Sequence, residues 1–323
     1  MSTVSRALND YPDVSQETKQ RILKIVETYH YRPNGNAKNL KQSSTNNVNI
    51  VVKGRGNPFF EGIVEQMQSR LARKGLHALV TYIDERSDEI EEAVRLCHEK
   101  KPEGIIFLGG VASRYAESLR NFTVPCVVST VYVPFQENDV HGCVCVNDEE
   151  AAGSAVEYLI RRGHRQIAIL GGRLGNADGI ERRYNGAVRV MREHGIAFDA
   201  AYYRASKFSL KDAYQGTQDL LGSGAPFTAL FAMSDVMAIG AAKAIIDSGR
   251  RVPDDISVIG FDGIAMSRFY NPSLATVQQP SREVADASVD LLVCKIKGEK
   301  AERNVIFLPT RLIEGASVRR LAP

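Results

Sequence analysis

Short β-rich runs of apolar residues alternate with amphipathic helical segments from residue 48 onward, and this alternation constrains the fold more than any other feature of the chain. Consecutive parallel strands need crossover connections of about a dozen or more residues, which are usually helices. A continuous apolar run such as residues 104–108 suits a strand that is buried on both faces. The predicted strands lie near residues 48–53, 76–82, 104–108, 125–129, 142–146, 166–170, 228–231 and 256–260.

The number and spacing of these runs predict an α/β fold with two doubly wound parallel-sheet lobes, one on either side of about residue 147. The length of 323 residues is enough for two or three packed domains. In open sheets of this kind, ligands bind outside the carboxyl ends of the strands. Two such lobes therefore predict a binding site in the cleft between them.

Residues 1–45 differ from the rest of the chain in both charge and pattern. They hold seven Lys and Arg against four acids, whereas the remaining residues carry 34 of each sign. From the predicted N-cap Ser15, apolar residues recur at helical spacing until Pro33, and the uncharged stretch 42–47 is typical of a linker. Clustered cations on a small segment fit contact with phosphates, although a solvated helix face explains the charge equally well.

Cysteine usage and hydropathy exclude several classes of protein. The five cysteines are odd in number and lie in apolar surroundings without metal-ligand spacing, which predicts reduced core thiols and no metal site. No stretch approaches the roughly 18 consecutive apolar residues of a membrane span, and the N-terminus lacks a leader pattern. We therefore expect a cytoplasmic protein with no membrane partner. The cysteines are Cys97, Cys126, Cys143, Cys145 and Cys294.

Motifs for cofactor binding and catalysis are incomplete or absent. Residues 54–59 follow a predicted strand and open a helix like a dinucleotide fingerprint, but the third glycine is missing. The sequence contains no nucleophile elbow, phosphate-binding loop or zinc-ligand cluster. We expect neither a cofactor nor enzymatic activity, and we predict no catalytic residues.

Several segments resemble signatures of the lactose/galactose repressor (LacI/GalR) family. The octet Ser-Thr-Val-Ser-Arg-Ala-Leu-Asn at residues 2–9 is similar to the recognition helix of that family. Four further segments in the body are similar to family signatures, and they follow one another in the family's order. They are residues 158–168, 182–186, 234–240 and 252–262.

The resemblance implies a homodimer that binds palindromic operator DNA through two helical headpieces, with a core related to periplasmic sugar-binding proteins. A two-fold dimer reads two half-sites of a palindrome. The octet begins almost at Met1, so the first helix and turn of the usual helix-turn-helix have no counterpart in this chain. We expect a truncated headpiece, and weak operator binding by the 323-residue chain.

The resemblance also implies that a crossover near Pro280 leads into a helix over residues 281–297 and a strand near 303–308, which return to the first lobe. The predicted domains are a headpiece with its hinge helix, an N-terminal core lobe and a C-terminal core lobe. Their limits are residues 1–45, residues 46–147 plus 280–309, and residues 148–279 plus 310–323.

At positions that match the family's recognition helix, Met1, Ser2 and Arg6 would face base edges in the major groove. Arg6 could fork onto guanine, a pairing worth about 1–3 kcal/mol of discrimination. The alternatives for Arg6 are a phosphate contact or a solvated side chain. The positions better suited to phosphate contacts or packing are Thr3, Ser5 and Asn9.

Residues 37–41 match the family's hinge helix. Leu40 would be the wedge that enters the minor groove at the operator centre, with Lys38 and Lys41 beside it. An apolar wedge unstacks a base step and bends the DNA. The alternative for Leu40 is a linker residue that touches the core.

The resemblance assigns an effector site to the predicted cleft. Phe59 and Phe60 would cover the ligand, Arg183 would fork onto its oxygens, and Asp262 would accept from its hydroxyl or amine groups. Alternatives remain open, because Phe60 could belong to the core, while Asp148 and Asp235 could cap helices. The other candidate ligand-binding residues are Asn147, Asp148, Phe208 and Asp235.

These observations predict an effector-responsive, DNA-binding transcriptional regulator that represses a carbohydrate-utilisation operon. Its partners would be operator DNA, a second copy of the chain, and a sugar or sugar derivative in the cleft. The alternative is a cytoplasmic sugar-binding sensor that does not bind DNA because of the truncated headpiece.

Overall fold

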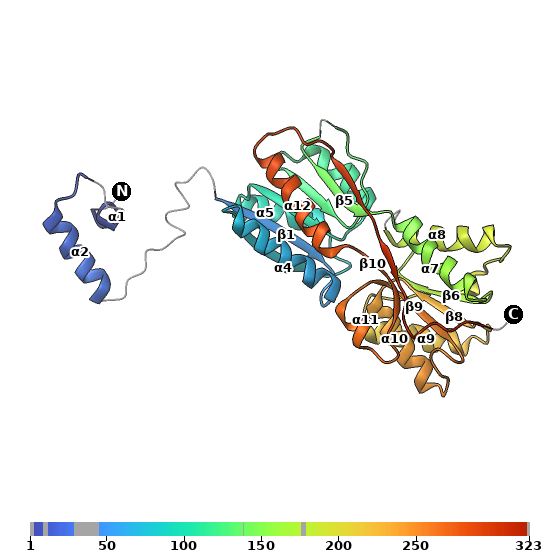
Figure 1. Cartoon of the computed structure of the whole chain (residues 1–323). Coiled ribbons are helices and arrows are strands. Elements are labelled where there is room, and N and C mark those ends of the chain that lie inside the picture. Colours follow the sequence, from blue (N-terminus) through green and yellow to red (C-terminus); the bar gives the residue numbers. More distant parts are fainter. Residues whose placement is uncertain (1–2, 9–11, 29–44, 138, 176–178, 322–323) are drawn as a thin grey trace. The chain divides into compact units, whose positions relative to one another are not determined.

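The computed structural model describes residues 3–8, 12–28, 45–137, 139–175 and 179–321. The chain divides into two compact units, Met1–Thr45 and Asn46–Pro323 (Figure 1). In the first unit, helix α1 (Thr3–Leu8) precedes helix α2 (Gln16–Thr28). The Ser15 hydroxyl accepts a hydrogen bond from the amide of Thr18 at 3.3 Å, which confirms the predicted start of this helix. Ala7 and Val14 are buried in this unit.

The first sheet of the second unit consists of six parallel strands. They are β1 (Asn47–Lys53), β2 (His77–Ile83), β3 (Gly104–Leu108), β4 (Cys126–Ser129), β5 (Gly142–Val146) and β11 (Val305–Leu308). Their order is β11-β5-β4-β3-β1-β2. The late strand β11 pairs with β5, so the chain returns to this sheet after a long excursion, as the family resemblance implied.

The second sheet also has six strands. They are β6 (Ile167–Gly171), β7 (Tyr203–Ala205), β8 (Ala229–Ala232), β9 (Ser257–Asp262), β10 (Ala275–Gln278) and β12 (Arg311–Ile313). Their order is β12-β10-β9-β8-β6-β7, and β12 alone runs antiparallel to its neighbour β10. The sequence did not indicate β7, β10 or β12. Each has only three or four residues, which is too short to show a period.

Helices cover both faces of each sheet (Figure 1). Strand β1 shows the reason, since Val48, Ile50 and Val52 face one apolar cluster and Val51 faces another on the opposite side. The first sheet packs against α4 (Pro58–Arg73) and α12 (Ser281–Ile296) on one face, and α5 (Glu89–Lys100) and α6 (Ala112–Ser118) on the other. The second packs against α7 (Asp148–Arg161) and α8 (Gly179–Glu193), and against α9 (Leu210–Gly222) and α10 (Asp235–Asp247).

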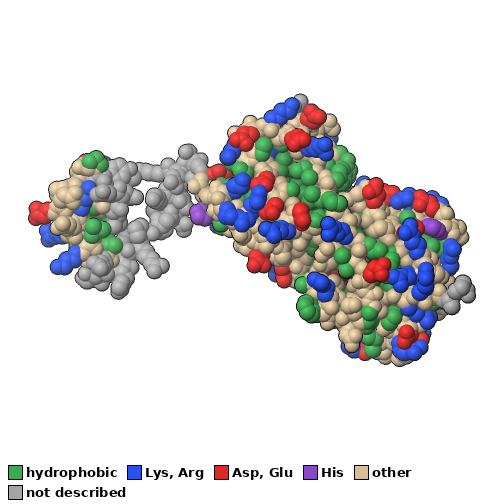
Figure 2. Space-filling view, viewed as in Figure 1, with side chains coloured by type: hydrophobic (Ala, Val, Ile, Leu, Met, Phe, Trp, Pro, Cys, Tyr) green, Lys and Arg blue, Asp and Glu red, His purple; other side chains and the backbone are tan. Residues whose placement is uncertain are grey.

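Shorter elements complete the described part of the chain. They are the 3₁₀ helices η1 (Leu119–Asn121) and η2 (Ala200–Tyr202), and the helix α11 (Ala265–Phe269). Figure 2 shows Lys and Arg interspersed with Asp and Glu over the visible face of both lobes. This mixture agrees with the balanced charge of the sequence after residue 45.

Candidate functional site

A cavity of about 780 Å³ lies between the two lobes of the Asn46–Pro323 unit. Residues at the carboxyl ends of β1, β3, β6 and β9 line it. In both sheets the strand order reverses at this place, between β1 and β3 in one and between β6 and β8 in the other. A crevice at such a switch point is where doubly wound folds bind ligands. We call this cavity the cleft.

Aromatic side chains line the cleft from both lobes. Phe60 of α4 lies so close to Gly109 that a methyl group on this glycine would be 3.2 Å from the ring. In the other lobe, a methyl group on Gly172 would likewise lie 3.2 Å from the ring of Phe208. Phe59 also lines the cleft but is only 5% exposed and belongs to the apolar core of the first lobe. Flat apolar rings on two walls suit the faces of a ring-shaped ligand.

Arg183 of α8 lies at the base of the cleft, held by groups on every side. Its Nε donates to Asp148 Oδ1 at 2.8 Å, and its Nη1 donates to the carbonyl oxygen of Met233 at 2.7 Å. The guanidinium carbon lies 3.8 Å from the centre of the Phe261 ring, a cation–π contact. These contacts fix the plane of the guanidinium group before any ligand arrives.

Asp262 ends β9 beside Arg183, with 4.0 Å between Arg183 Nη1 and Asp262 Oδ1. Its φ of 108° is in the left-handed region, and such backbone strain in a non-glycine residue concentrates at binding and catalytic sites. Burial raises the pKa of Asp262 to about 8, and Arg183 opposes this shift. Gln279 Nε2 donates to Asp262 Oδ1 at 2.8 Å, while Gln279 Oε1 has no partner in the described part of the chain. Gln279 Oε1 is therefore a buried acceptor beside Asp262 that no described group uses.

Three of the predicted ligand-binding residues do not line the cleft. Asn147 caps α7 by accepting from the amide of Glu150. Asp148 is fully buried behind Arg183. Asp235 accepts from the Thr276 hydroxyl at 2.6 Å and from the Ile264 amide at 2.8 Å. Asp148 and Asp235 thus hold the base of the cleft together, and direct ligand contact by these three residues stays a prediction.

The sequence reading missed several residues that the fold brings to the cleft. Lys53 ends β1, Arg114 lies in α6, and Gln279 follows β10. Lys53 could have been found, because it ends a predicted strand at the carboxyl edge. Arg114 and Gln279 lie on elements that the sequence did not indicate, so no local signal pointed to them.

In the N-terminal unit, Arg6 forms an exposed ion pair with Asp13, with 2.9 Å between Nη1 and Oδ2. Thr3 is exposed at the start of α1, and Ser5 belongs to the same helix. The remaining predicted DNA contacts lie outside the described residues. They are Met1, Ser2, Asn9, Lys38, Leu40 and Lys41.

No cluster of three or more His, Cys, Asp or Glu side chains that could hold a metal ion occurs among the described residues. None of the helices in the described ranges is both long and apolar enough to cross a membrane.

The two lobes and their cleft define a ligand-binding core of the periplasmic-binding-protein class. Residues 156–318 match the family model of the periplasmic binding protein-like domain. Residues 1–34 match that of bacterial regulatory proteins, lacI family. Over 317 residues the chain is 34% identical to the HTH-type transcriptional regulator MalR of Clostridium butyricum, covering 97% of this chain and 94% of MalR.

Solved structures agree with this classification. The lac repressor dimer bound to operator and the anti-inducer ONPF is 27% identical with a TM-score of 0.78, covering 98% of this chain and 94% of that one. A complex of the transcriptional regulator CelR with cellobiose is 26% identical with a TM-score of 0.75, covering 98% and 95%. The chain belongs to the LacI family of bacterial transcriptional regulators. This finding favours a DNA-binding regulator over a sugar-binding protein without DNA function.

Proposed function

We propose that this protein is a repressor whose affinity for operator DNA is controlled by a sugar or sugar derivative bound in the cleft. The observation that carries the effector proposal is the combination of Phe60 and Phe208 on opposite walls with the buried Arg183–Asp262 pair at the base. Rings that stack on a sugar, together with a fixed donor and acceptor for its hydroxyls, make up a carbohydrate site. The similarity to a cellobiose complex supports the same ligand class.

Operator binding is proposed to use the N-terminal unit of two copies of the chain on a palindromic site. Arg6 is exposed on α1 and would give up its ion pair with Asp13 to form hydrogen bonds with the edge of a guanine base. An exposed ion pair is worth about 0–1 kcal/mol, so this exchange costs little. The similarity to an operator-bound repressor dimer supports both the DNA partner and the dimer.

The proposed role is binding without catalysis. The cleft presents aromatic rings, Arg183 and the Asp262–Gln279 pair, which recognise a ligand by stacking and hydrogen bonds. Since its partner would be chromosomal operator DNA, we propose that the protein acts in the cytoplasm. Ligand binding would shift the lobes, and this shift would change how the two N-terminal units fit their half-sites.

The test combines DNA retention with a ligand screen on the 323-residue chain. A promoter fragment from the protein's own operon should be retarded at low salt in the presence of scrambled competitor DNA, and the Arg6→Ala variant should bind about 5- to 150-fold more weakly. In thermal-shift screening, a sugar at about 100 times its Kd should add roughly 2.7 kcal/mol of stability. The same sugar should release the promoter. Retention of promoter and scrambled DNA with equal affinity would overturn the proposal.

A further inference from the structure

The wall of the cleft that the first lobe forms carries an excess of positive charge. Lys53, Arg55, Arg86 and Arg114 line it, and Glu85 is the one carboxylate among the described lining residues of that lobe. Burial raises the pKa of Glu85, and Lys207 of the other lobe opposes this shift. The visible outer surface mixes both signs (Figure 2), so the imbalance is a feature of the cleft.

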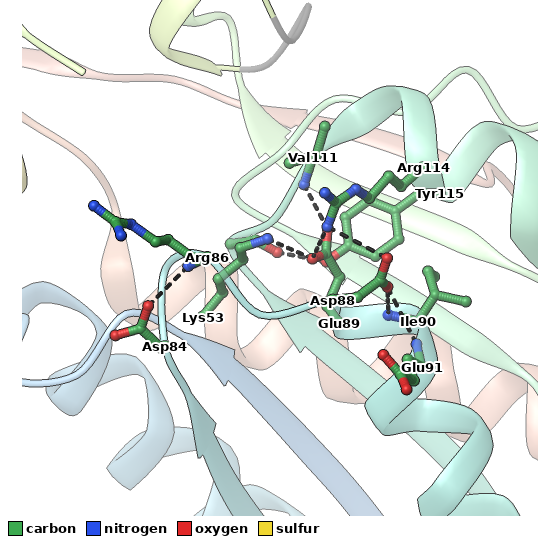
Figure 3. Close-up of polar contacts among 11 residues, drawn as sticks. Lys53, Asp84, Arg86, Asp88, Glu89, Ile90, Glu91, Val111, Arg114 and Tyr115 are labelled. Atoms are coloured by element: carbon green, nitrogen blue, oxygen red, sulfur yellow. Dashed lines mark hydrogen bonds and ion pairs between the residues drawn. The ribbon is translucent and has the colours of Figure 1, made fainter. Parts of the chain in front are cut away.

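A buried carboxylate holds two of these cations in place. Glu89, the first residue of α5, is fully buried, and its Oε2 lies 2.5 Å from Lys53 Nζ. Its Oε1 accepts from the amide of Val111 at 2.8 Å, and its Oε2 lies 3.4 Å from Arg114 Nη1 (Figure 3). Asp88 adds a second contact to Arg114 Nη1, at 3.5 Å. A buried carboxyl group needs such partners to offset its loss of water, and the same contacts hold Lys53 and Arg114 at the wall.

These contacts do not use all the N–H donors of Lys53 and Arg114. An ammonium group has three N–H donors and a guanidinium group has five. The contacts of Arg114 in the described part of the chain all involve Nη1, and its side chain is 41% exposed. Arg55 and Arg86 form no ion pair with any carboxylate that the structure describes. The wall can therefore bind an anion without first breaking its own structure.

Electrostatics decides between a neutral and an acidic ligand. If the lobes closed over a neutral sugar, Arg55, Arg86 and the donors of Arg114 that Glu89 and Asp88 do not use would lose water and gain no charged partner, which is unfavourable. An acidic group on the ligand would replace that water with charge-assisted hydrogen bonds, and these are about twice as strong as neutral ones.

We propose, building on the function proposed above, that the effector carries an acidic group, a phosphate or a carboxylate, and that Lys53 and Arg114 bind this group at the first lobe. The ring of the same ligand lies between Phe60 and Phe208, towards Arg183 and Asp262. Glu89 is a positioning residue in this arrangement, since it touches the two cations and not the ligand.

Inorganic phosphate is the probe that tests the anion site directly. Titration calorimetry of the 323-residue chain with phosphate at low ionic strength should show saturable binding. In the Arg114→Gln variant the affinity should fall about tenfold or more, as expected for the loss of a charged hydrogen bond. The matched control is Arg95→Gln on α5, because Arg95 is also half-exposed and paired with two acids, Glu92 and Glu99, but does not line the cleft. Its affinity for phosphate should stay within about twofold of the parent.

Absence of saturable phosphate binding, or an equal loss of affinity in the Arg114→Gln and Arg95→Gln variants, would overturn the inference.

Thermal shifts with glucose, glucose 6-phosphate and glucuronate then separate the two sources of negative charge. A larger shift with the phosphate ester assigns a sugar phosphate, and a larger shift with glucuronate assigns a sugar acid. If only glucose shifts the unfolding temperature, the proposal that the effector carries an acidic group is wrong, and the proposed repressor function is unaffected. Phosphate binding without promoter retention overturns the repressor and leaves the anion site standing.

Discussion

Two buried carboxyl groups, Asp235 and Asp262, connect the base of the cleft to the stability of the fold. Burial raises the pKa of Asp235 to about 7 and that of Asp262 to about 8, against roughly 3.9 in an unfolded chain. Between these values the folded protein binds more protons than the unfolded chain. The free energy of unfolding therefore falls as the pH rises from about 4 to about 8.

The Asp235→Asn variant tests this sign. An amide can donate to the Thr276 hydroxyl and accept from the Ile264 amide, so both hydrogen bonds can persist without a charge. We expect the variant to match the parent near pH 5 and to be the more stable protein near pH 8, measured by urea unfolding across the range. The control is Asp247→Asn, because Asp247 is paired with Lys243 and has a lowered pKa. Equal pH slopes for the parent and Asp235→Asn would contradict the prediction.

At the residue scale, the sequence predicted which residues line the cleft better than it predicted what each residue contacts. Arg183 and Asp262 carry the family's motifs and both line the cleft. Asp235 lies in a family motif and Asp148 was a further candidate, but in the structure they accept hydrogen bonds from Thr276 and Arg183, respectively. Which way a carboxylate points depends on partners about 35 to 41 residues away in sequence, and a local motif contains no information about them.

At the scale of elements, helices α7 and α8 approach closely at a glycine. A methyl group on Gly186 would lie 2.0 Å from the carbonyl oxygen of Glu149, which is backbone and cannot rotate away. Gly186→Ala should therefore push the two helices apart. We expect a loss of about 1–3 kcal/mol in the free energy of unfolding, as for other overpacked positions.

Gly62 provides the matched control for that substitution. It lies inside helix α4, and a methyl group there would meet no atom within 4 Å. Alanine is the better helix former, so Gly62→Ala should raise the free energy of unfolding by about 0.5–1 kcal/mol. Chemical denaturation of both variants provides the comparison. A stabilising effect of Gly186→Ala would show that the packing of α7 on α8 is looser than described.

Strands that are long, such as β2, or fully buried were predicted from the sequence, and the three missed strands are neither. The strands found from sequence, such as β3 and β6, are fully buried apolar runs. The strands that were missed in the second sheet are short, and β12 lies at an edge where only one side is paired. The strand geometry of β7 and β12 comes from pairing with β6 and β10, because three residues with mixed exposure carry no period of their own.

At the scale of the whole Asn46–Pro323 unit, the chain passes between the lobes three times. It crosses after β5, after β10 and after β11. The lobes are joined by three short connections, and Val236 and Ile264 of the second lobe also pack on the apolar cluster of the first. Rotation of lobes as bodies is the usual way in which two-lobed proteins respond to a ligand. Contacts between the lobes outside the cleft therefore set how easily it opens.

One such contact joins Arg182 of α8 to Tyr132, which follows β4 in the other lobe. The guanidinium carbon lies 5.1 Å from the centre of the tyrosine ring, and that ring stacks on Phe307 of β11 at 5.3 Å. Neither Arg182 nor Tyr132 lines the cleft. A cation–π contact of this kind is worth about 0.5–1 kcal/mol, so it can bias the lobes without touching the ligand.

The Arg182→Met variant should therefore bind the effector about two- to fivefold more weakly, measured by calorimetry with the compound that gives the largest thermal shift. The control is Arg162→Met. Arg162 makes a similar contact, 4.9 Å from the ring centre of Tyr158, but both residues belong to helix α7 and its C-cap within one lobe. Both variants lose one cation–π contact, and Arg162→Met also loses an ion pair with Glu314 in its own lobe, but only Arg182→Met loses a link between lobes. If both variants lowered the affinity for the effector equally, the effect would come from a lower stability of the fold. The contact between Arg182 and Tyr132 would then have no part in opening the cleft.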